Sequence, residues 1–224
     1  NFSTLGTPGT HNVARWDGDA WQPLQNGLPD WDIGVTGYSL EVFGGRLYVG
    51  GNFNGIDGTF ASRLVAWDGA HWQSVGGVSG QDLKTTVLAL HAFGDRLWVG
   101  GEFTRAGVTQ TFGPGSIVSA DVVSFDGATY HQASNGLGAD AEVYDLVAWN
   151  GGVVSVGRFV EAGGAQASRV AFFDGNDWSG LGATDGNVQE ALVWEGKLVI
   201  TGDFTSVDGV STGALAVHGG SGRS

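Results

Sequence analysis

The sequence predicts an all-β protein, and specifically a β-propeller built of about four four-stranded blades. Three observations predict it: an aromatic-Asp-Gly motif recurs at intervals of 51, 58 and 48 residues, 41 glycines stand against four prolines, and short β patterns alternate with turn residues. Glycine tolerates the positive φ of tight hairpin turns, so its abundance suits a protein with many such turns. No segment has a pattern that favours a helix.

Two sequence anchors repeat in phase along the chain. The first anchor is an aromatic residue, then Asp-Gly, then a second aromatic residue three positions later: Trp16-Asp17-Gly18 with Trp21, Trp67-Asp68-Gly69 with Trp72, Phe125-Asp126-Gly127 with Tyr130, and Phe173-Asp174-Gly175 with Trp178. The second anchor is Gly-x-Phe: Gly51-Asn52-Phe53, Gly101-Glu102-Phe103, Gly157-Arg158-Phe159 and Gly202-Asp203-Phe204. Internal repeats of this length indicate one supersecondary unit per repeat.

Each unit contains four short β patterns. In one copy they are Val87–Phe93, Arg96–Phe103, Asp121–Phe125 and Tyr130–Ala133. We expect two-residue hairpins between the first and second strands at Gly44-Gly45, Gly94-Asp95, Gly151-Gly152 and Glu195-Gly196, and between the third and fourth strands at the Asp-Gly pairs. Four antiparallel strands at this period describe propeller blades, whose faces the repeated aromatic residues fill.

The blades are expected to form a single domain over residues 1–224, with repeats at about 12–62, 63–121, 122–168 and 169–212 and partial repeats at 1–11 and 213–224. The chain then holds three complete blades, a leading strand pair at Asn12 to Leu24, and a trailing pair at Asn187 to Phe204 with an extra strand near Val217. A closed four-bladed ring would put both pairs in one blade. The alternative is an arc of a larger propeller, with open blade edges available for self-association or strand sharing.

The repeat also points to a family. A second strand that ends in Gly-Gly, an aromatic-Asp third strand and a Trp a few residues later resemble the kelch motif and the related bacterial surface-protein repeats of the form aromatic-Asp-Gly-x-x-Trp. The last two copies differ, with Val156-Gly157 and Thr201-Gly202 in place of Gly-Gly. The resemblance implies a propeller of more than four blades, which favours the arc, but kelch-like propellers include both binding modules and enzymes.

Composition excludes several classes of partner. A net charge of -13 would repel a phosphate backbone, so we expect no nucleic-acid partner. No window approaches the roughly 20 apolar residues of a membrane-spanning helix, so we expect no membrane insertion. The absence of Cys excludes disulfides and thiolate metal sites. Because the chain has no Met, we interpret it as a processed or excised part of a longer secreted protein, located outside the cell or on its surface.

The longer loops are expected at one edge of the blades and carry the candidate ligand-binding residues. These candidates are Trp31, Asp32, Asp82, Phe112, Asp140 and Asp185. Phe112 belongs to the longest loop, Thr104 to Ala120. Loop acids could coordinate calcium or sugar hydroxyls, or could be simple solvated side chains. Since no Asp-x-Asp-x-Asp-Gly spacing occurs, we expect no metal and no cofactor, with calcium as the open alternative.

Three acids on the innermost strands are the alternative catalytic residues. Glu41, Asp145 and Glu190 fall at or near matching repeat positions, and a pair of carboxylates is what glycoside hydrolysis needs. Polar residues also line water-filled channels without catalytic roles. The sequence therefore favours an extracellular binding module for a protein or glycan ligand. The alternatives are a structural repeat segment of a large surface protein and a carbohydrate-active enzyme.

Overall fold

The computed structural model describes residues 11–28, 35–56, 58–80, 84–108 and 116–218, and within these ranges all regular structure is β. Three four-stranded antiparallel sheets follow one another along the chain. Sheet 1 contains β3 (Gly37–Phe43), β4 (Arg46–Gly51), β7 (Leu64–Trp67) and β8 (Trp72–Ser74). Sheet 2 contains β10 (Thr86–Phe93), β11 (Arg96–Glu102), β14 (Val122–Phe125) and β15 (Tyr130–Gln132). Sheet 3 contains β16 (Glu142–Trp149), β17 (Gly152–Arg158), β20 (Val170–Phe173) and β21 (Trp178–Gly180). The predicted all-β class and the predicted four strands per unit are confirmed.

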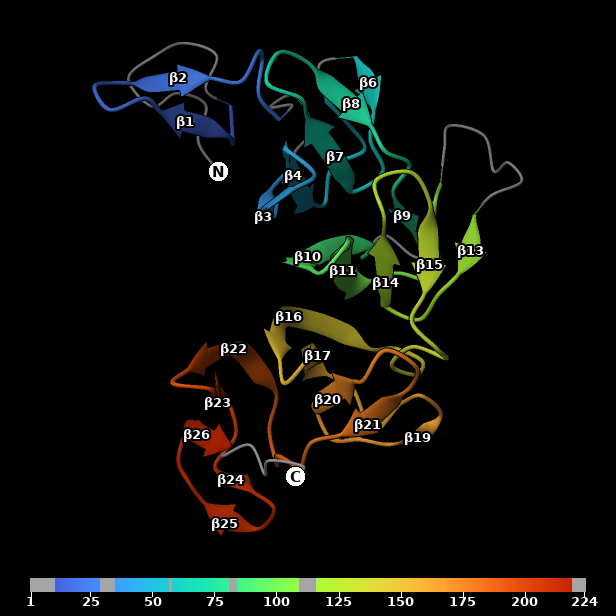
Figure 1. The fold of residues 1–224 in the computed structure, drawn as a ribbon, viewed down its shortest axis with the longest axis vertical. Helices are drawn as coiled ribbons and strands as arrows, with labels where there is room; N and C mark the ends of the chain where they lie inside the picture. Colours follow the sequence, from blue (N-terminus) through green and yellow to red (C-terminus); the bar gives the residue numbers. More distant parts are fainter. Residues whose placement is uncertain (1–10, 29–34, 57, 81–83, 109–115, 219–224) are drawn as a thin grey trace.

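Incomplete sheets flank these three. The leading pair consists of β1 (Ala14–Trp16) and β2 (Trp21–Pro23), and the trailing sheet consists of β22 (Val188–Trp194), β23 (Lys197–Gly202) and β26 (Leu215–His218). Both end pairs and the extra strand lie where the sequence predicted them. Among the described residues no strand of the leading pair pairs with the trailing sheet, because β26 occupies the outer edge of β23. The sheets form a curved row whose ends are not joined by strand pairing (Figure 1).

The connection between the second and third strands of each unit contains short strands that the sequence analysis treated as loop. These are β5 (Gly55–Ile56) with β6 (Thr59–Phe60), β12 (Arg105–Ala106) with β13 (Ile117–Val118), β18 (Glu161–Ala162) with β19 (Ala165–Gln166), and β24 (Ser206–Val207) with β25 (Val210–Ser211). In sheet 2 this connection also pairs with β9 (Val78–Ser79) of the preceding loop. The sequence does contain a signal for these short hairpins, a turn dipeptide between the two paired strands, such as Asp208-Gly209 between Val207 and Val210.

The repeated aromatic residues occupy equivalent places in successive sheets. In each copy the first aromatic residue ends the third strand, and the second lies opposite it at the start of the fourth strand. The ring centroids are 5.5 Å apart for Trp16 and Trp21, 5.0 Å for Trp67 and Trp72, 4.6 Å for Phe125 and Tyr130, and 5.2 Å for Phe173 and Trp178. The fourth-strand aromatic residue also packs toward the preceding sheet. The indole Nε1 of Trp178 donates to the carbonyl of Ala133, and that of Trp72 donates to the carbonyl of Leu24. The motif therefore joins neighbouring sheets.

Two features of the turns differ from the prediction. Between the third and fourth strands the turn has four residues, because the Asp side chain accepts two backbone N–H groups: in the first copy Asp17 Oδ1 accepts from Asp19 and Ala20. The Asp-Gly pair is thus part of an Asx turn and not a two-residue hairpin. Between β16 and β17 the two turn residues are Asn150 and Gly151, both at positive φ, and Gly152 already belongs to β17.

Glycine in the second strand allows the next sheet to approach closely. A Cβ at Gly50 would lie 3.5 Å from Leu90 Cδ1, and a Cβ at Gly100 would lie 3.2 Å from Leu146 Cδ1, with Val87 and Val143 closer still. Leu90 and Leu146 are buried as a result. Where Val156 takes the glycine position in sheet 3, the facing residue of the trailing sheet is the small Ala191. The side-chain volumes of neighbouring sheets are therefore matched.

Gly100→Ala is expected to destabilise the protein by about 1–3 kcal/mol, because the added methyl group overpacks the contact with Val143 and Leu146. Urea denaturation of the variant and the parent chain measures this loss. Gly180→Ala in β21 is the matched control, since a Cβ there meets only ordinary contacts from 3.4 Å outward. Equal losses of unfolding free energy in Gly100→Ala and Gly180→Ala would contradict a tight contact of Gly100 with Val143 and Leu146.

Candidate functional site

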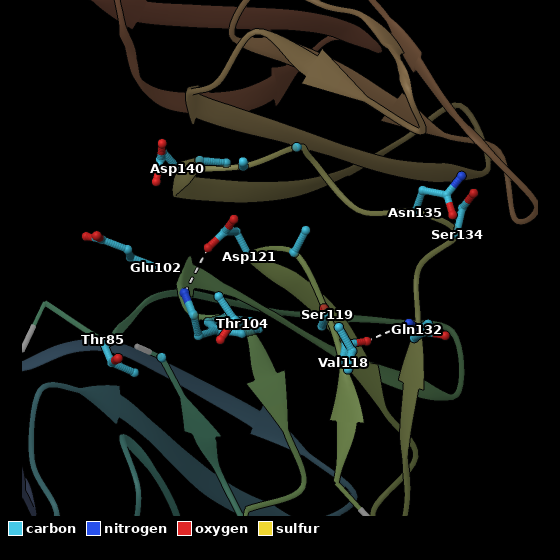
Figure 2. Close-up of a pocket in the computed structure, with 16 residues that line it drawn as sticks. Thr85, Glu102, Thr104, Val118, Ser119, Asp121, Gln132, Ser134, Asn135 and Asp140 are labelled. Atoms are coloured by element: carbon cyan, nitrogen blue, oxygen red, sulfur yellow. Dashed lines mark hydrogen bonds between the residues drawn. The ribbon is translucent and has the colours of Figure 1, made fainter. Parts of the chain in front are cut away.

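A hollow of about 940 Å³ opens between sheets 2 and 3, at the edge where the longer loops lie. We name it the acidic pocket, after its three carboxylates, Glu102, Asp121 and Asp140. Figure 2 shows these carboxylates on one side of the pocket and the neutral polar side chains of Gln132, Ser134 and Asn135 on the other. Most of the lining comes from the ends of β11 and β15 and from the residues that lead into β14 and β16, and the rest includes Gly80 and Thr85, before β10, and Val118 of β13.

Asp121 stands at a repeat position that is occupied by arginine in the neighbouring sheets. Its backbone N–H donates to the carbonyl of Phe103 and its own carbonyl accepts from Gly101. Arg63 in sheet 1 and Arg169 in sheet 3 make the same two bonds, with the equivalent Phe and Gly residues. All three residues have a positive φ, 67° for Arg63, 63° for Asp121 and 70° for Arg169. The backbone is thus the same and only the side chain differs.

The two arginines close the gap to the next sheet. Arg63 Nε donates to the carbonyl of Thr85 at 2.7 Å, just before β10, and its guanidinium also contacts Asn54 Oδ1. Arg169 donates to the carbonyl of Thr184 at 2.8 Å and to Asn187 Oδ1 at 3.4 Å, just before β22. Between sheets 2 and 3 the shorter Asp121 replaces the guanidinium, and the acidic pocket occupies this place.

Asp121 is a buried residue, 5% exposed, on the wall of the pocket. Its Oδ1 accepts a hydrogen bond from the backbone N–H of Phe103 at 2.8 Å. Burial, together with the nearby charges of Glu102, Asp140 and Glu142, raises the pKa of Asp121 to about 7, although the Phe103 bond opposes this. A buried carboxylate beside other carboxylates is stabilised by a cation.

Beside the pocket, Glu142 is already neutralised. Arg158 Nη2 contacts Glu142 Oε1 at 2.7 Å, and the Tyr144 hydroxyl donates to Glu142 Oε2 at 2.6 Å. The Arg158 bond holds the pKa of Glu142 below its usual range. The guanidinium of Arg158 is thus already paired with a carboxylate of the chain itself, beside the acidic pocket.

The residues predicted to bind ligand are only partly brought together. Asp140 lines the acidic pocket. Asp185 instead joins the loop before β22 to the segment after β23, because its carboxylate accepts from Thr205 N, Thr205 Oγ1 and Ser206 N at 2.6–2.9 Å, which lowers its pKa. The other predicted residues, Trp31, Asp32, Asp82 and Phe112, lie outside the described residues.

Asp121 and Glu102 were missed at the sequence level, although a signal exists. Arg63, Asp121 and Arg169 each stand four residues before the aromatic residue of the first anchor. Aligning the repeats on this anchor would have shown a reversal of charge in one copy. The leading copy has Asn12 at this position, so Asp121 is the one acid among two arginines and a neutral residue.

The three alternative catalytic acids do not form one group. Asp145 and Glu190 occupy equivalent positions in β16 and β22 and both line a small hollow of about 180 Å³. Glu41 lies two positions further along β3, since the residue that matches Asp145 there is Ser39, and its carboxylate accepts from the backbone N–H of Val42. Two of the three acids therefore share a repeat position, and Glu41 lies near it.

Asp145 has a structural role in its sheet interface. Its two oxygens accept from the backbone N–H groups of Leu146 at 2.8 Å and of Ala191, in the next sheet, at 2.9 Å. Ser39 Oγ accepts in the same way from Leu90 N of sheet 2 at 3.0 Å. Burial raises the pKa of Asp145. The carboxylate of Asp145 is therefore held in place by backbone hydrogen bonds from two adjacent sheets.

Within the described ranges, no cluster of three or more His, Asp or Glu side chains is placed to bind a metal ion. Those ranges also contain no helix of the length and hydrophobicity needed to cross a bilayer.

Comparison with known proteins gives no family. No family model matches the chain, and no curated protein is found to be similar to it. Among solved structures, the computationally designed Ika8 protein is similar to 80% of this chain, with 16% sequence identity and a TM-score of 0.41. The matched region spans about half of that designed protein (50%). Similarity at this level does not define the fold, which is given by the strand pairing of the chain itself.

The raised pKa of Asp121 predicts an unusual dependence of stability on pH. In the folded state this group stays protonated up to pH of about 7, while in the unfolded chain it ionises near its ordinary pKa of about 3.8. Its contribution to stability is fully present below pH 4 and is lost as the pH rises to 7, by up to about 1.4 kcal/mol per pH unit.

Asp121→Asn removes this titration and keeps the side-chain shape. We expect the free energy of unfolding of the parent chain to fall, relative to the variant, between pH 4 and pH 7. Urea denaturation at several pH values measures the difference. Parallel curves for the two proteins would contradict the burial of an ionisable Asp121.

Proposed function

We propose that this chain is an open arc of a kelch-like β-propeller and acts as a binding module, with the acidic pocket as its recognition site. The ligand group for this pocket is a guanidinium or ammonium group, such as an arginine or lysine side chain of a protein partner. The observation that carries the proposal is the replacement of Arg63 and Arg169 by Asp121 at the equivalent position of sheet 2.

Charge favours this ligand over the alternatives. The pocket has three carboxylates in its lining, and the adjacent cation Arg158 is already bound to Glu142. A neutral glycan would leave the ionised form of Asp121 without a counter-ion, whereas a guanidinium supplies charge and several N–H donors in a fixed geometry. Among the predicted ligand classes, a protein is therefore preferred to a glycan. The extracellular location stays a prediction.

Pocket geometry suits a side chain that enters from the loop edge. The neutral groups across from the carboxylates, among them Ser134 and Asn135, supply further polar contacts for the stem or the backbone of a peptide (Figure 2). Binding would then be reinforced by hydrogen bonds around a charged centre, which contribute about 1.5–3 kcal/mol each when one partner is ionised.

The test uses an acetylated and amidated Ala-Ala-Arg-Ala-Ala peptide and its citrulline analogue, which has nearly the same shape without the charge. We expect the arginine peptide to bind at least about tenfold more tightly, measured by isothermal titration calorimetry. Asp121→Asn should remove most of this preference. Asp95→Asn, in the β10–β11 turn at the other end of β11, is the control with the same change of charge.

Asp121→Arg gives a sharper result. The variant should fold, because Arg63 and Arg169 adopt the same backbone conformation, and its guanidinium should close the pocket. We expect an unchanged or higher thermal midpoint together with loss of peptide binding. Binding that survives in folded Asp121→Arg, or equal affinity for the two peptides, would contradict the proposed site.

Affinity should also depend on pH. Because the pKa of Asp121 is raised to about 7, a cation that binds its carboxylate must displace a proton at pH 6 but not at pH 8. We expect binding of the arginine peptide to weaken about tenfold from pH 8 to pH 6. The Asp121→Asn variant should lose this dependence. An equal decrease in the variant would assign the titration to another group.

A further inference from the structure

The first strands of successive sheets are joined by side-chain hydrogen-bond acceptors. Each first strand is the edge strand of its sheet, so part of its backbone N–H groups point away from the ladder. Between sheets 1 and 2, Ser39 Oγ accepts from Leu90 N at 3.0 Å. Between sheet 3 and the trailing sheet, Asp145 Oδ2 accepts from Ala191 N at 2.9 Å. In both interfaces the acceptor belongs to the preceding first strand.

Between sheets 2 and 3 a histidine takes this role. Ala89 stands at the position of Ser39 and Asp145, and a methyl group cannot accept a hydrogen bond. Leu146 N, the counterpart of Leu90 N, instead donates to Asp145 Oδ1 of its own strand at 2.8 Å. The bond between the two sheets is therefore displaced by two residues along both strands, where Ala148 N donates to His91 Nε2 at 3.0 Å.

The three acceptors respond differently to protonation. A hydroxyl group such as that of Ser39 accepts at any ordinary pH, and the carboxyl group of Asp145 keeps acceptor capacity when it is protonated. An imidazole nitrogen accepts only while it has no proton, so His91 has its proton on Nδ1 when Nε2 receives the Ala148 N–H. In the imidazolium both ring nitrogens are donors, and the Ala148 N–H then loses its acceptor.

The surroundings of His91 keep any change local. His91 is half-buried, so protons from water can reach it. Its cross-strand neighbour Trp98 packs against sheet 3, with ring centroids 5.2 Å from Phe173 and 6.3 Å from Trp178. These aromatic contacts hold sheets 2 and 3 together whether or not the Ala148 bond is present. Loss of the bond thus frees a short stretch of the first strands and leaves both sheets folded.

The charged groups on the neighbouring strands permit protonation of His91. Asp145 of β16 interacts electrostatically with His91, and this attraction favours the imidazolium. The carboxylate of Asp145 itself remains on the Leu146 and Ala191 amides. The other charged residues on strands packed against β10 each have contacts elsewhere: Glu41 with the Val42 amide, Arg46 with Tyr48, Arg96 with Asp95 and Asp126, Glu142 with Arg158, and Glu102 in the lining of the acidic pocket.

We propose that His91 is a proton-sensitive tie between sheets 2 and 3, which releases the Ala148 N–H when the imidazole takes up a proton. Histidine ordinarily changes its charge between about pH 5 and pH 8, so acidification in this range loosens the first strands at this interface. Ser39 and Asp145 hold the interfaces on either side. The row of sheets then has one joint that responds to pH, and it lies at the opposite edge of the interface from Asp121.

The test measures amide hydrogen exchange by NMR at pH 7.5 and pH 5, each corrected for the intrinsic rate. We expect protection of the Ala148 amide to fall at least about fivefold at pH 5, because one hydrogen bond is lost. The Leu90 amide is the internal control, since its acceptor, Ser39 Oγ, does not titrate. Its protection should stay unchanged. Equal falls at both amides would indicate general loosening and would contradict a specific tie.

Two variants assign the titrating group. His91→Gln places a neutral amide oxygen near the position of Nε2, so Ala148 should be equally protected at both pH values. Asp121→Asn removes the group whose pKa is raised to about 7 at the other edge of the same interface, and it should keep the fall. A fall that persists in His91→Gln, or that disappears in Asp121→Asn, would overturn the proposal.

The unmodified chain supplies a further readout. The ¹⁵N shifts of the His91 ring report its protonation directly across the same pH range. Their midpoint should coincide with the midpoint of the loss of Ala148 protection. Separate midpoints, or protection of Ala148 that is equal at pH 7.5 and pH 5, would show that the imidazole does not control this bond.

Discussion

The arrangement of this protein depends on one interface, repeated between successive sheets, in which the second strand of one sheet lies against the first strand of the next. Gly50 and Gly100 permit the approach, and the leucines and valines of the following first strand fill the space that the missing side chains leave. Because interiors are packed at high density, a single methyl group matters at such a contact. The curved row of Figure 1 follows from repeating this contact.

Polar bonds fix the same interface at its edges. Ser39 and Asp145 accept backbone N–H groups from the next sheet, and Trp72 and Trp178 donate to the sheet before. Ser39 and Asp145 thereby satisfy the backbone N–H groups of Leu90 and Ala191, which lie on first strands at the edges of their sheets. The chain thus spends several of its polar side chains on holding sheets in place, which leaves fewer of them for chemistry.

Much of the fold could be predicted from the sequence because each repeat carries its own turn and packing residues. The aromatic-Asp-Gly motif located the third and fourth strands in every copy, and the end pairs were found by the same anchors. The sequence could not show how the row ends, because β26 and β1 have similar patterns and the choice between them depends on tertiary pairing. The short strands between β4 and β7 were missed because two-residue strands have no periodicity to detect.

The candidate site was predicted only in part, for a related reason. Asp140 was identified from its place in a loop, but Asp121 lies at a strand entrance whose importance depends on what Arg63 and Arg169 do in the adjacent sheets. That relation exists between repeats and not within one. It also implies that the scaffold can gain or lose a pocket without changing its backbone. A sheet interface sealed by its own arginine differs from one that leaves a hollow by a single side chain, so successive sheets can differ in the openings at their edge while the architecture stays constant.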